Sequence, residues 1–303
     1  MRLKMLSMGN PKTGKTGSLA ALLNAGWNVR YVDLDGNVAP LLAYTKEDKR
    51  KHLSVFSPSS KYKMETVKVG MWNGFDPTQQ DDSESPDSWT QINIALFSPE
   101  RQWSDGSLPT SWKADTDLLV IDSLTALGDQ FKAWWLAKSN TDFRGDLNYK
   151  AYGAAYARLQ NFIMTITNYL DCSFLFITHE NREDDFMLDD QTDVWDRVFD
   201  PNDVSAKNIR LTYIKNRIPM MEERMGKGFR PTFIGRKFNN QLPKLFNSII
   251  SYHSDNGRRY IQHFSDKYHD LNCLPFPMDR KPLPIESGLE AIFSAAKKHQ
   301  DFA

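Results

Sequence analysis

The sequence predicts an α/β fold built on a mostly parallel central sheet with helices on both faces. Continuously apolar runs at Leu118–Asp122 and Phe174–Thr178 are typical of strands that are buried on both sides, as in a parallel sheet. Between them, apolar residues recur at helical spacing from about Leu147 to Leu170, which predicts a long amphipathic helix. Strands that alternate with helices in this way indicate parallel pairing through crossover helices.

The other elements of this core follow from local patterns in chain order. Leu3–Met8 is a short apolar strand, and Lys15–Asn24 predicts an apolar helix that begins directly after a Gly-rich turn. Asn28–Asp33 predicts a second strand that ends in acidic residues. The polar stretch from about 44 to 114 gives only weak signals, apart from a helix expected over Asp87–Phe97.

Three later segments predict strands with shorter connections: Ile209–Ile214, Ser248–His253 and Arg259–Phe264. We expect these strands to extend the sheet as antiparallel neighbours on its C-terminal side. A final helix is expected to open with a capping box formed by Ser287 and Glu290.

These elements suggest a division of the chain into two parts. Residues 1–270 form the expected core, which contains a polar insertion at about 44–114 and an acidic, then basic, loop region at about 181–229. Residues 271–303 are expected to be a Pro-rich linker followed by the C-terminal helix.

Length and composition exclude several classes of protein. The chain has 303 residues, of which 40% are hydrophobic and 25% charged, so collagen-like, coiled-coil and wholly disordered structures are excluded. No apolar run approaches the roughly 18 residues of a transmembrane helix, and the first residues lack the apolar stretch of a signal peptide. Cys172 and Cys273 are far apart and fit neither a disulfide framework nor a zinc site. We therefore expect a cytoplasmic protein with no membrane partner.

A net charge of zero hides a strong local asymmetry. Glu180–Asp203 contains ten acidic residues against two arginines, whereas Val204–Ile261 contains twelve Lys or Arg against three acidic residues. Aromatic residues are interleaved with the basic segment, and basic groups combined with stacking rings suit single-stranded nucleic acid. The alternative is an ordinary solvated face whose aromatic residues fill the core.

The strongest motif is a phosphate-binding loop. GNPKTGKT, starting at Gly9, matches G-x-x-x-x-G-K-[ST] and lies between an apolar strand and a helix, where such a loop must lie. Its N–H groups and the positive end of the following helix would bind the phosphates of ATP. The predicted nucleotide-binding residues are Gly9, Asn10, Pro11, Lys12, Thr13, Gly14, Lys15, Thr16 and Gly17.

The loop predicts the partners of the phosphates and of Mg²⁺. Lys15 would reach the β- and γ-phosphates, and the Thr16 hydroxyl would ligate Mg²⁺. Asp122, at the end of a buried strand, is the expected acid that holds the metal through water. A strand-ending Asp is also a common turn former, which is the alternative for this residue.

Hydrolysis further needs a group that activates or orients water. Asp33 and Asp35 follow the second strand, where a carboxylate could approach the γ-phosphate, although a plain Asp/Gly turn is the alternative. His179 and Glu180 end a third strand, where a polar group could sense the γ-phosphate; a surface histidine is the alternative.

Three segments behind the phosphate loop carry a family resemblance. The chain resembles the RecA-type ATPase core and, more narrowly, the phage-encoded RecA-like single-strand annealing proteins, the fourth type of the Sak group. The similarity covers about 1–40 and 115–180, and a later stretch at 231–246 is similar to that group's LPxxF segment. The segments are YVDLD at 31–35, LLVIDSLTAL at 118–127 and FLFITHE at 174–180.

The resemblance implies a RecA-like P-loop NTPase fold and the same phosphate and Mg²⁺ roles for Lys15, Thr16 and Asp122. It also places the catalytic carboxylate at Asp35 and the γ-phosphate-sensing residue at His179. Two departures matter here. Asp35 is one methylene shorter than the family's usual Glu, and His179 replaces an amide side chain.

The resemblance also bears on assembly. Lys215 and Arg217 are similar to the basic pair that RecA inserts into a neighbouring subunit's ATP site, so it implies a homo-oligomer that completes the catalytic site. We expect RecA's helical segment before the P-loop strand to be absent, so filament formation is not expected to carry over.

Together these features predict an ATP-hydrolysing DNA recombination protein that binds single-stranded DNA and promotes annealing or strand pairing. A single-strand DNA-binding protein is a further candidate partner, and a phage origin would place the chain in the host cytoplasm. Three alternatives stay open: a P-loop motor such as a helicase or packaging ATPase, a small-molecule P-loop kinase with a lid from basic residues at 46–51, and an ATP-gated scaffold without turnover.

Overall fold

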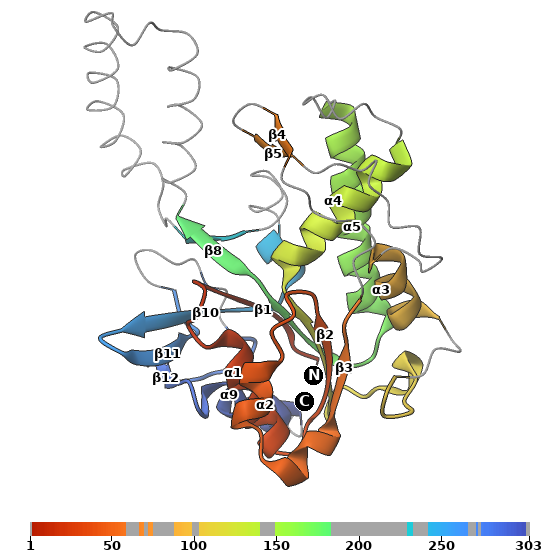
Figure 1. The fold of residues 1–303 in the computed structure, drawn as a ribbon. Helices are drawn as coiled ribbons and strands as arrows, with labels where there is room; N and C mark the ends of the chain where they lie inside the picture. The colour runs from red at the N-terminus through yellow and green to blue at the C-terminus, as the bar shows by residue number, and fades with distance from the viewer. Residues whose placement is uncertain are drawn as a thin grey trace, which may run out of the picture.

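An eight-stranded sheet lies at the centre of the fold (Figure 1). The computed structural model describes residues 2–58, 67–69, 72–74, 88–98, 103–139, 149–182, 229–232, 242–265, 271 and 274–300. The strand order is β12-β11-β10-β1-β7-β6-β2-β3. The strands are β1 (Lys4–Gly9), β2 (Asn28–Asp33), β3 (Leu53–Phe56), β6 (Asp117–Asp122), β7 (Ser173–Ile177), β10 (Ser248–Asp255), β11 (Arg258–Gln262) and β12 (Leu283–Pro284).

The six strands from β10 to β3 are all parallel, and β11 and β12 add antiparallel pairings at one edge. Two small antiparallel pairs lie outside this sheet, β4 (Val67–Val69) with β5 (Trp72–Gly74) and β8 (His179–Arg182) with β9 (Phe229–Thr232). The predicted α/β architecture is confirmed: a mostly parallel sheet, with antiparallel strands added by the C-terminal part of the chain.

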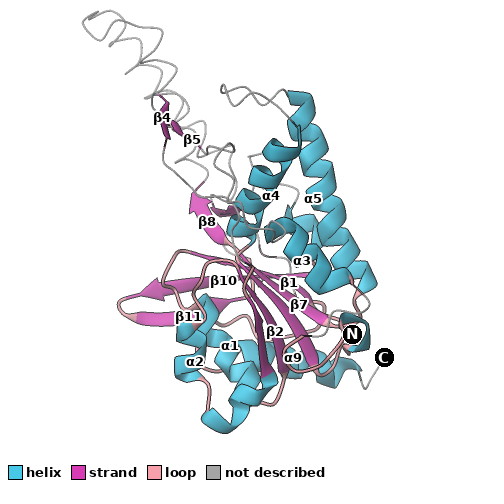
Figure 2. Ribbon diagram, turned by 45° about the vertical axis from the view of Figure 1, so that its right-hand side comes forward, coloured by secondary structure: helices cyan, strands magenta, loops and turns pink. Residues whose placement is uncertain are grey.

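Helices cover both faces of the sheet (Figure 2). One face carries α1, α2 and α9, and the other carries α3, α4 and α5. Short 3-10 helices η1 (Glu47–His52), η2 (Pro109–Ser111) and η3 (Leu242–Leu245) connect other elements. The helices are α1 (Lys15–Asn24), α2 (Ala39–Tyr44), α3 (Ser88–Phe97), α4 (Leu124–Ser139), α5 (Tyr149–Tyr169) and α9 (Gly288–Gln300).

The central strand β6 explains why its sequence is continuously apolar. Leu119 and Ile121 pack into the core under α3, α4 and α5, whereas Leu118 and Val120 pack into the core under α1 and α9. All four side chains are fully buried, and each contributes about 1.5–3 kcal/mol through removal of apolar surface from water. A strand buried on both faces cannot alternate with polar residues.

Several expectations differ from the structure. β10 was expected to be antiparallel to the sheet but pairs in parallel with β1, so only β11 and β12 follow the expected direction. The capping box at α9 is not formed, because Glu290 accepts a hydrogen bond from Ser294 and the Ser287 N–H donates to the carbonyl of Pro284. The strand predicted at Ile209–Ile214 lies outside the described residues.

Other segments gain structure that the sequence did not indicate. The polar stretch after residue 44 contributes β3, which pairs in parallel with β2 at the edge of the sheet. The Pro-rich stretch after residue 273 packs Leu274 and Phe276 into the core before it forms β12. Among the described helices, none is long and apolar enough to cross a membrane.

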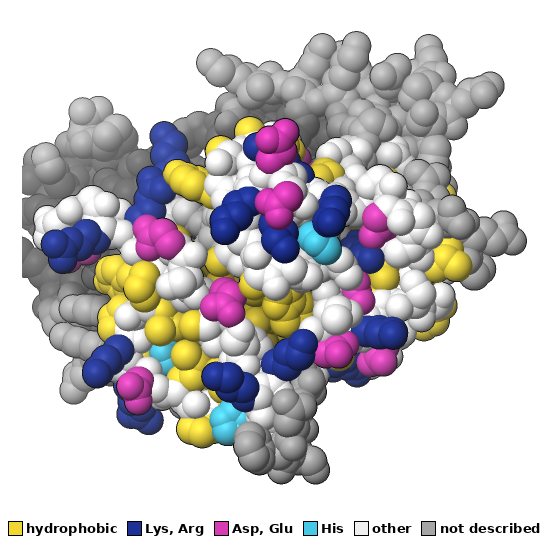
Figure 3. Space-filling view, turned by 90° about the horizontal axis from the view of Figure 1, so that it is seen from below, with side chains coloured by type: hydrophobic (Ala, Val, Ile, Leu, Met, Phe, Trp, Pro, Cys, Tyr) yellow, Lys and Arg dark blue, Asp and Glu magenta, His cyan; other side chains and the backbone are white. Residues whose placement is uncertain are grey.

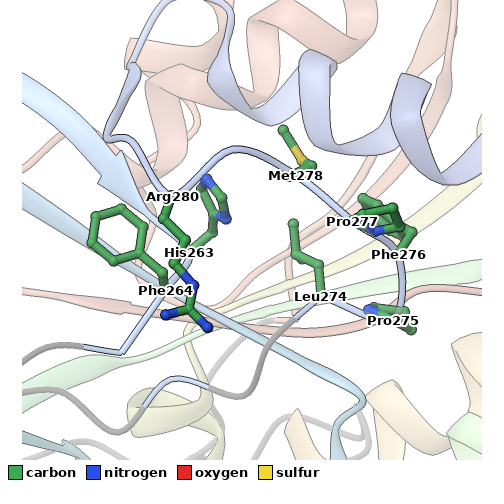
Figure 4. A pocket seen from close by; sticks show the side chains of 8 residues that line it. All are labelled: His263, Phe264, Leu274, Pro275, Phe276, Pro277, Met278 and Arg280. Atoms are coloured by element: carbon green, nitrogen blue, oxygen red, sulfur yellow. The ribbon is translucent and has the colours of Figure 1, made fainter.

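An open cavity of about 540 Å³ lies beside the end of β11 (Figure 4). Its walls are largely apolar and include Phe264, Leu274 and Met278, with His263 and Arg280 as the polar members. Because β11 runs antiparallel to β10, this cavity is at the edge of the sheet where the parallel strands begin. It is therefore separate from the edge where those strands end and where the phosphate loop lies.

Candidate nucleotide-binding site

The loop between β1 and α1 has the backbone of an anion-binding site. Gly9, Lys12 and Gly14 adopt positive φ angles of 155°, 67° and 95°, which bend the chain tightly around the start of α1. Gly14 is the N-cap residue of α1, and no side chain caps the helix. The first N–H groups of α1 are thus left for a ligand, and the positive end of the helix dipole favours an anion there.

Two glycines of this loop have close neighbours from later parts of the chain. A Cβ atom on Gly9 would lie 2.7 Å from the backbone carbonyl oxygen of Tyr252, which leaves no room for a methyl group. A Cβ atom on Gly14 would lie 2.9 Å from Cδ1 of Ile285, and 3.5 Å from Cδ of Arg259. The loop is therefore held against β10 and the segment that follows β12, and its path depends on both.

Gly9→Ala is expected to lower the melting temperature and to weaken nucleotide binding at least about tenfold. Strained backbone costs about 1–3 kcal/mol, and the Cβ atom must also displace the Tyr252 carbonyl. Gly26→Ala is the matched control, because Gly26 also has a positive φ of 92° but its Cβ would meet nothing within 4 Å. Thermal melts and titration with a fluorescent nucleotide would test this, and equal losses in both variants would contradict it.

Lys15 spans the mouth of the loop from the first turn of α1. Its Nζ donates hydrogen bonds to the carbonyl oxygens of Gly9 at 2.6 Å and Asn10 at 2.8 Å, and only 7% of the residue is exposed. Burial lowers the pKa of Lys15 to about 8, although the carboxylates of Asp122, Glu180 and Asp35 act in the opposite direction. The ammonium group thus faces the loop interior, where phosphates would bind.

Thr16 and Asp122 lie in contact beside this lysine. Thr16 Oγ1 donates a 2.6 Å hydrogen bond to Asp122 Oδ2, which joins the start of α1 to the end of β6. Burial raises the pKa of the Asp122 carboxyl, and the hydrogen bonds from Thr16 and Tyr31 oppose this shift. A buried carboxylate at the end of a strand is costly unless a cation or a donor faces it.

The Thr16–Asp122 pair fits a Mg²⁺ ion. Because the Thr16 hydroxyl donates its hydrogen bond to the carboxylate, the lone pairs of its oxygen stay available for a cation. Mg²⁺ is usually bound through one or two protein oxygens together with substrate phosphates and water. The described part of the chain has no cluster of three or more His, Cys, Asp or Glu side chains that could hold a metal.

The two acids after β2 differ in their surroundings. Asp33 is buried directly beside Asp122 in the sheet register, and its Oδ1 accepts a hydrogen bond from the N–H of Asn37. Asp35 is exposed, and its charge raises the pKa of Lys15 and of Asp122. Asp33 therefore shapes the turn, and Asp35 is the acid that stays accessible next to the phosphate loop.

His179 and Glu180 lie at the start of β8, next to the same loop. Burial and the charge of Lys15 lower the pKa of His179, while Asp35 raises it. Among the described residues, no hydrogen-bond partner faces the buried Nδ1 of His179. Glu180 is buried and accepts a 3.1 Å hydrogen bond from Ser251 Oγ.

The structure thus brings together most of the residues predicted from the sequence. The phosphate loop, Asp122, Asp35 and His179 meet at the carboxyl ends of β1, β2, β6 and β7. Lys215 and Arg217 lie outside the described residues, so their role in a neighbouring subunit's site stays a prediction.

Three residues near the site were not identified from the sequence. Tyr31 contacts Asp122 through its hydroxyl, Arg259 has Cδ beside Gly14, and the ring of the exposed Tyr44 lies against Gly17. Tyr44 and Arg259 come from segments without a motif, whereas Tyr31 opens the YVDLD segment that carries the resemblance. Alternation along β2 puts Tyr31 on the same face as Asp33, but it does not identify Asp122 as the partner of the Tyr31 hydroxyl.

Comparisons with known proteins add little to this geometry. No family model matches the chain, and no curated protein does. Among solved structures, the chain is similar to an ATPase from the type III secretion system of pathogenic bacteria, with a TM-score of 0.39 and 9% sequence identity. The match covers 83% of this chain and about half, 51%, of that ATPase chain. The assignment of the site rests on its own contacts.

Proposed function

We propose that this protein is a Mg²⁺-dependent ATPase that acts on single-stranded DNA in recombination and promotes annealing or strand pairing. The observation that carries the ATPase part is the contact between the phosphate loop and Asp122. An uncapped helix start, a buried ammonium group and a Thr–Asp pair converge on one space, and a nucleoside triphosphate with Mg²⁺ is the ligand that uses all three.

Each residue then has a defined task in hydrolysis. Lys15 moves from the Gly9 and Asn10 carbonyls to the β- and γ-phosphates, where its charge stabilises the transition state. Thr16 and Asp122 would hold Mg²⁺, which would supply positive charge against the phosphate oxygens. Asp35 orients the attacking water from the exposed turn after β2.

His179 is placed to respond to the γ-phosphate. Its lowered pKa keeps the imidazole neutral at pH 7, so one ring nitrogen carries a proton and can donate a hydrogen bond to a phosphate oxygen. His179 is also the first residue of β8, and β8 pairs with β9 in an antiparallel ribbon that leaves the sheet at this point (Figure 1). A change at the γ-phosphate would therefore act directly on the base of the ribbon.

The DNA part of the proposal is supported by charge. The acidic run starts within β8 at Glu180, and the basic run continues through β9, so both runs are joined in sequence to a ribbon that starts beside the phosphate loop. The edge of the sheet opposite to the loop has Lys, Arg, Asp and Glu interspersed among its described residues (Figure 3). Mixed charge gives no continuous positive track for a phosphate backbone, which favours the basic run as the DNA contact.

ATP hydrolysis measured without nucleic acid, with single-stranded DNA and with duplex DNA tests the proposal. We expect Mg²⁺-dependent turnover that single strands stimulate more than duplex does. Lys15→Ala should lower the stimulated rate at least about a hundredfold, because a group that stabilises transition-state charge is lost. Lys46→Ala, which removes an exposed lysine beyond the far end of α1, is the matched control and should retain the rate. A rate of ATP hydrolysis that is the same with and without nucleic acid would contradict only the DNA part of the proposal.

A further inference from the structure

The Tyr31 hydroxyl is a buried polar group that the proposed reaction does not yet use. Tyr31 lies on β2 and is fully buried in the core under α1. Its hydroxyl donates a 2.6 Å hydrogen bond to Oδ2 of Asp122, on the neighbouring strand β6. Oδ2 is also the oxygen that accepts the 2.6 Å hydrogen bond from Thr16.

Two donors on one oxygen fix the orientation of the carboxylate. A carboxylate oxygen offers two lone-pair directions, and Tyr31 and Thr16 approach Oδ2 from a strand and from a helix. Rotation about the side-chain bonds of Asp122 would break both hydrogen bonds at once. The other oxygen, Oδ1, would thereby be kept in one position, where it could accept a hydrogen bond from a water bound to Mg²⁺.

The strand end that carries the candidate catalytic acid is tied to the same residue. The backbone N–H of Leu34 donates a 2.7 Å hydrogen bond to the carbonyl oxygen of Asp122. Tyr31 and Leu34 therefore fasten the end of β2 to Asp122 by its side chain and by its backbone. Asp35 follows Leu34 directly, so its distance from a Mg²⁺-bound phosphate depends on these two contacts.

We propose that Tyr31 is a positioning residue of the Mg²⁺ site, which it serves by fixing the Asp122 carboxylate. This inference rests on the proposed function, because it assumes that Mg²⁺ and nucleotide bind at this site. Groups that orient a metal ligand from behind typically change metal affinity 10–100-fold when they are removed. Tyr31 would thus act on Mg²⁺ without touching nucleotide or metal.

Tyr31→Phe tests the proposal, with Tyr252→Phe as its matched control. Tyr252 is an equally buried tyrosine in the same core. Its hydroxyl forms a 2.8 Å hydrogen bond with Ser18 Oγ, whereas that of Tyr31 bonds to Asp122. Both variants lose one buried hydroxyl. Binding of a fluorescent ADP is measured at increasing Mg²⁺ concentrations and in EDTA, and thermal melts report the stability of each protein.

We expect Tyr31→Phe to need about tenfold more Mg²⁺ for half-maximal enhancement of binding, with unchanged affinity in EDTA. Tyr252→Phe should keep the wild-type Mg²⁺ dependence even if its melting temperature falls by as much as that of Tyr31→Phe. If Tyr31→Phe keeps the Mg²⁺ dependence of the wild-type protein, or if both variants show the same shift, the proposal for Tyr31 is overturned. The proposed function still stands in that case, provided that the wild-type protein binds the nucleotide. A wild-type protein that binds no nucleotide overturns both.

Discussion

Asp122→Asn is expected to lower Mg²⁺-dependent ATP hydrolysis at least about a hundredfold while raising the melting temperature of the metal-free protein. The loss of activity follows because an amide gives Mg²⁺ no negative charge. The gain in stability follows because burial raises the pKa of this carboxyl, so the folded chain carries an unfavourable charge when no cation is bound. The oxygen that accepts from Thr16 and Tyr31 is retained by Asn, so neither hydrogen bond needs to be lost.

The pH dependence of this stability gain has a defined sign. A carboxyl whose pKa is higher in the folded than in the unfolded chain destabilises the fold increasingly as pH rises above its ordinary value of about 4. We therefore expect Asp122→Asn to melt at least about 2 °C higher than wild type at pH 7.5 in EDTA, with the gap closing toward pH 4. Calorimetry at several pH values measures it, and a lower melting temperature at pH 7.5 would refute the electrostatic explanation.

ATP affinity is expected to fall about tenfold for each pH unit above about 8. Lys15 has a pKa of about 8 in the free protein, so it loses its charge in this range. Bound phosphates favour the ammonium form, and binding above this pH must therefore take up a proton. The sign of the pH dependence follows: ATP affinity is constant below the pKa of Lys15 in the free protein and declines above it.

Lys15→Arg provides the control for this pH profile. A guanidinium group keeps its charge throughout the range, so the variant should bind ATP with an affinity that is almost independent of pH between 7 and about 9.5, even if it binds more weakly. Titration calorimetry in buffers of different ionisation enthalpy would detect the proton uptake directly. A wild-type affinity that does not change from pH 7 to about 9.5 would show that another group dominates binding.

The phosphate loop and its flanking elements are the part of the fold that local sequence determines. The predicted bounds of Lys15–Asn24 and Asn28–Asp33 agree with the structure at both ends, because a Gly-rich turn, an apolar helix and a strand ending in Asp are local signals. The direction of β10 could not be predicted in this way. Apolar spacing in Ser248–Asp255 identifies a strand, but its pairing with β1 depends on contacts between distant segments.

The candidate site shows the same division between local and distant information. Lys15 and Thr16 are identified by spacing alone, and Asp122 by its place at the end of an apolar strand. Tyr31 is different, since a tyrosine in NVRYVD indicates a core residue, which it is. Its hydroxyl acquires a role only because β6, with Asp122 91 positions along the chain, lies next to β2. The sequence of β2 alone therefore does not reveal that Asp122 lies beside Tyr31.

The place of β1 in the sheet has a consequence for synthesis on the ribosome. β1 is made before both of its neighbours, β7 and β10, and the Tyr252 carbonyl that confines the phosphate loop belongs to β10. Translation at about 5–20 residues per second separates β1 from β10 by roughly 10–50 s. During that interval the nascent chain presents an apolar strand and an unsupported loop. On the proposed function, ATP would therefore become a ligand only after β10 has been made and has paired with β1.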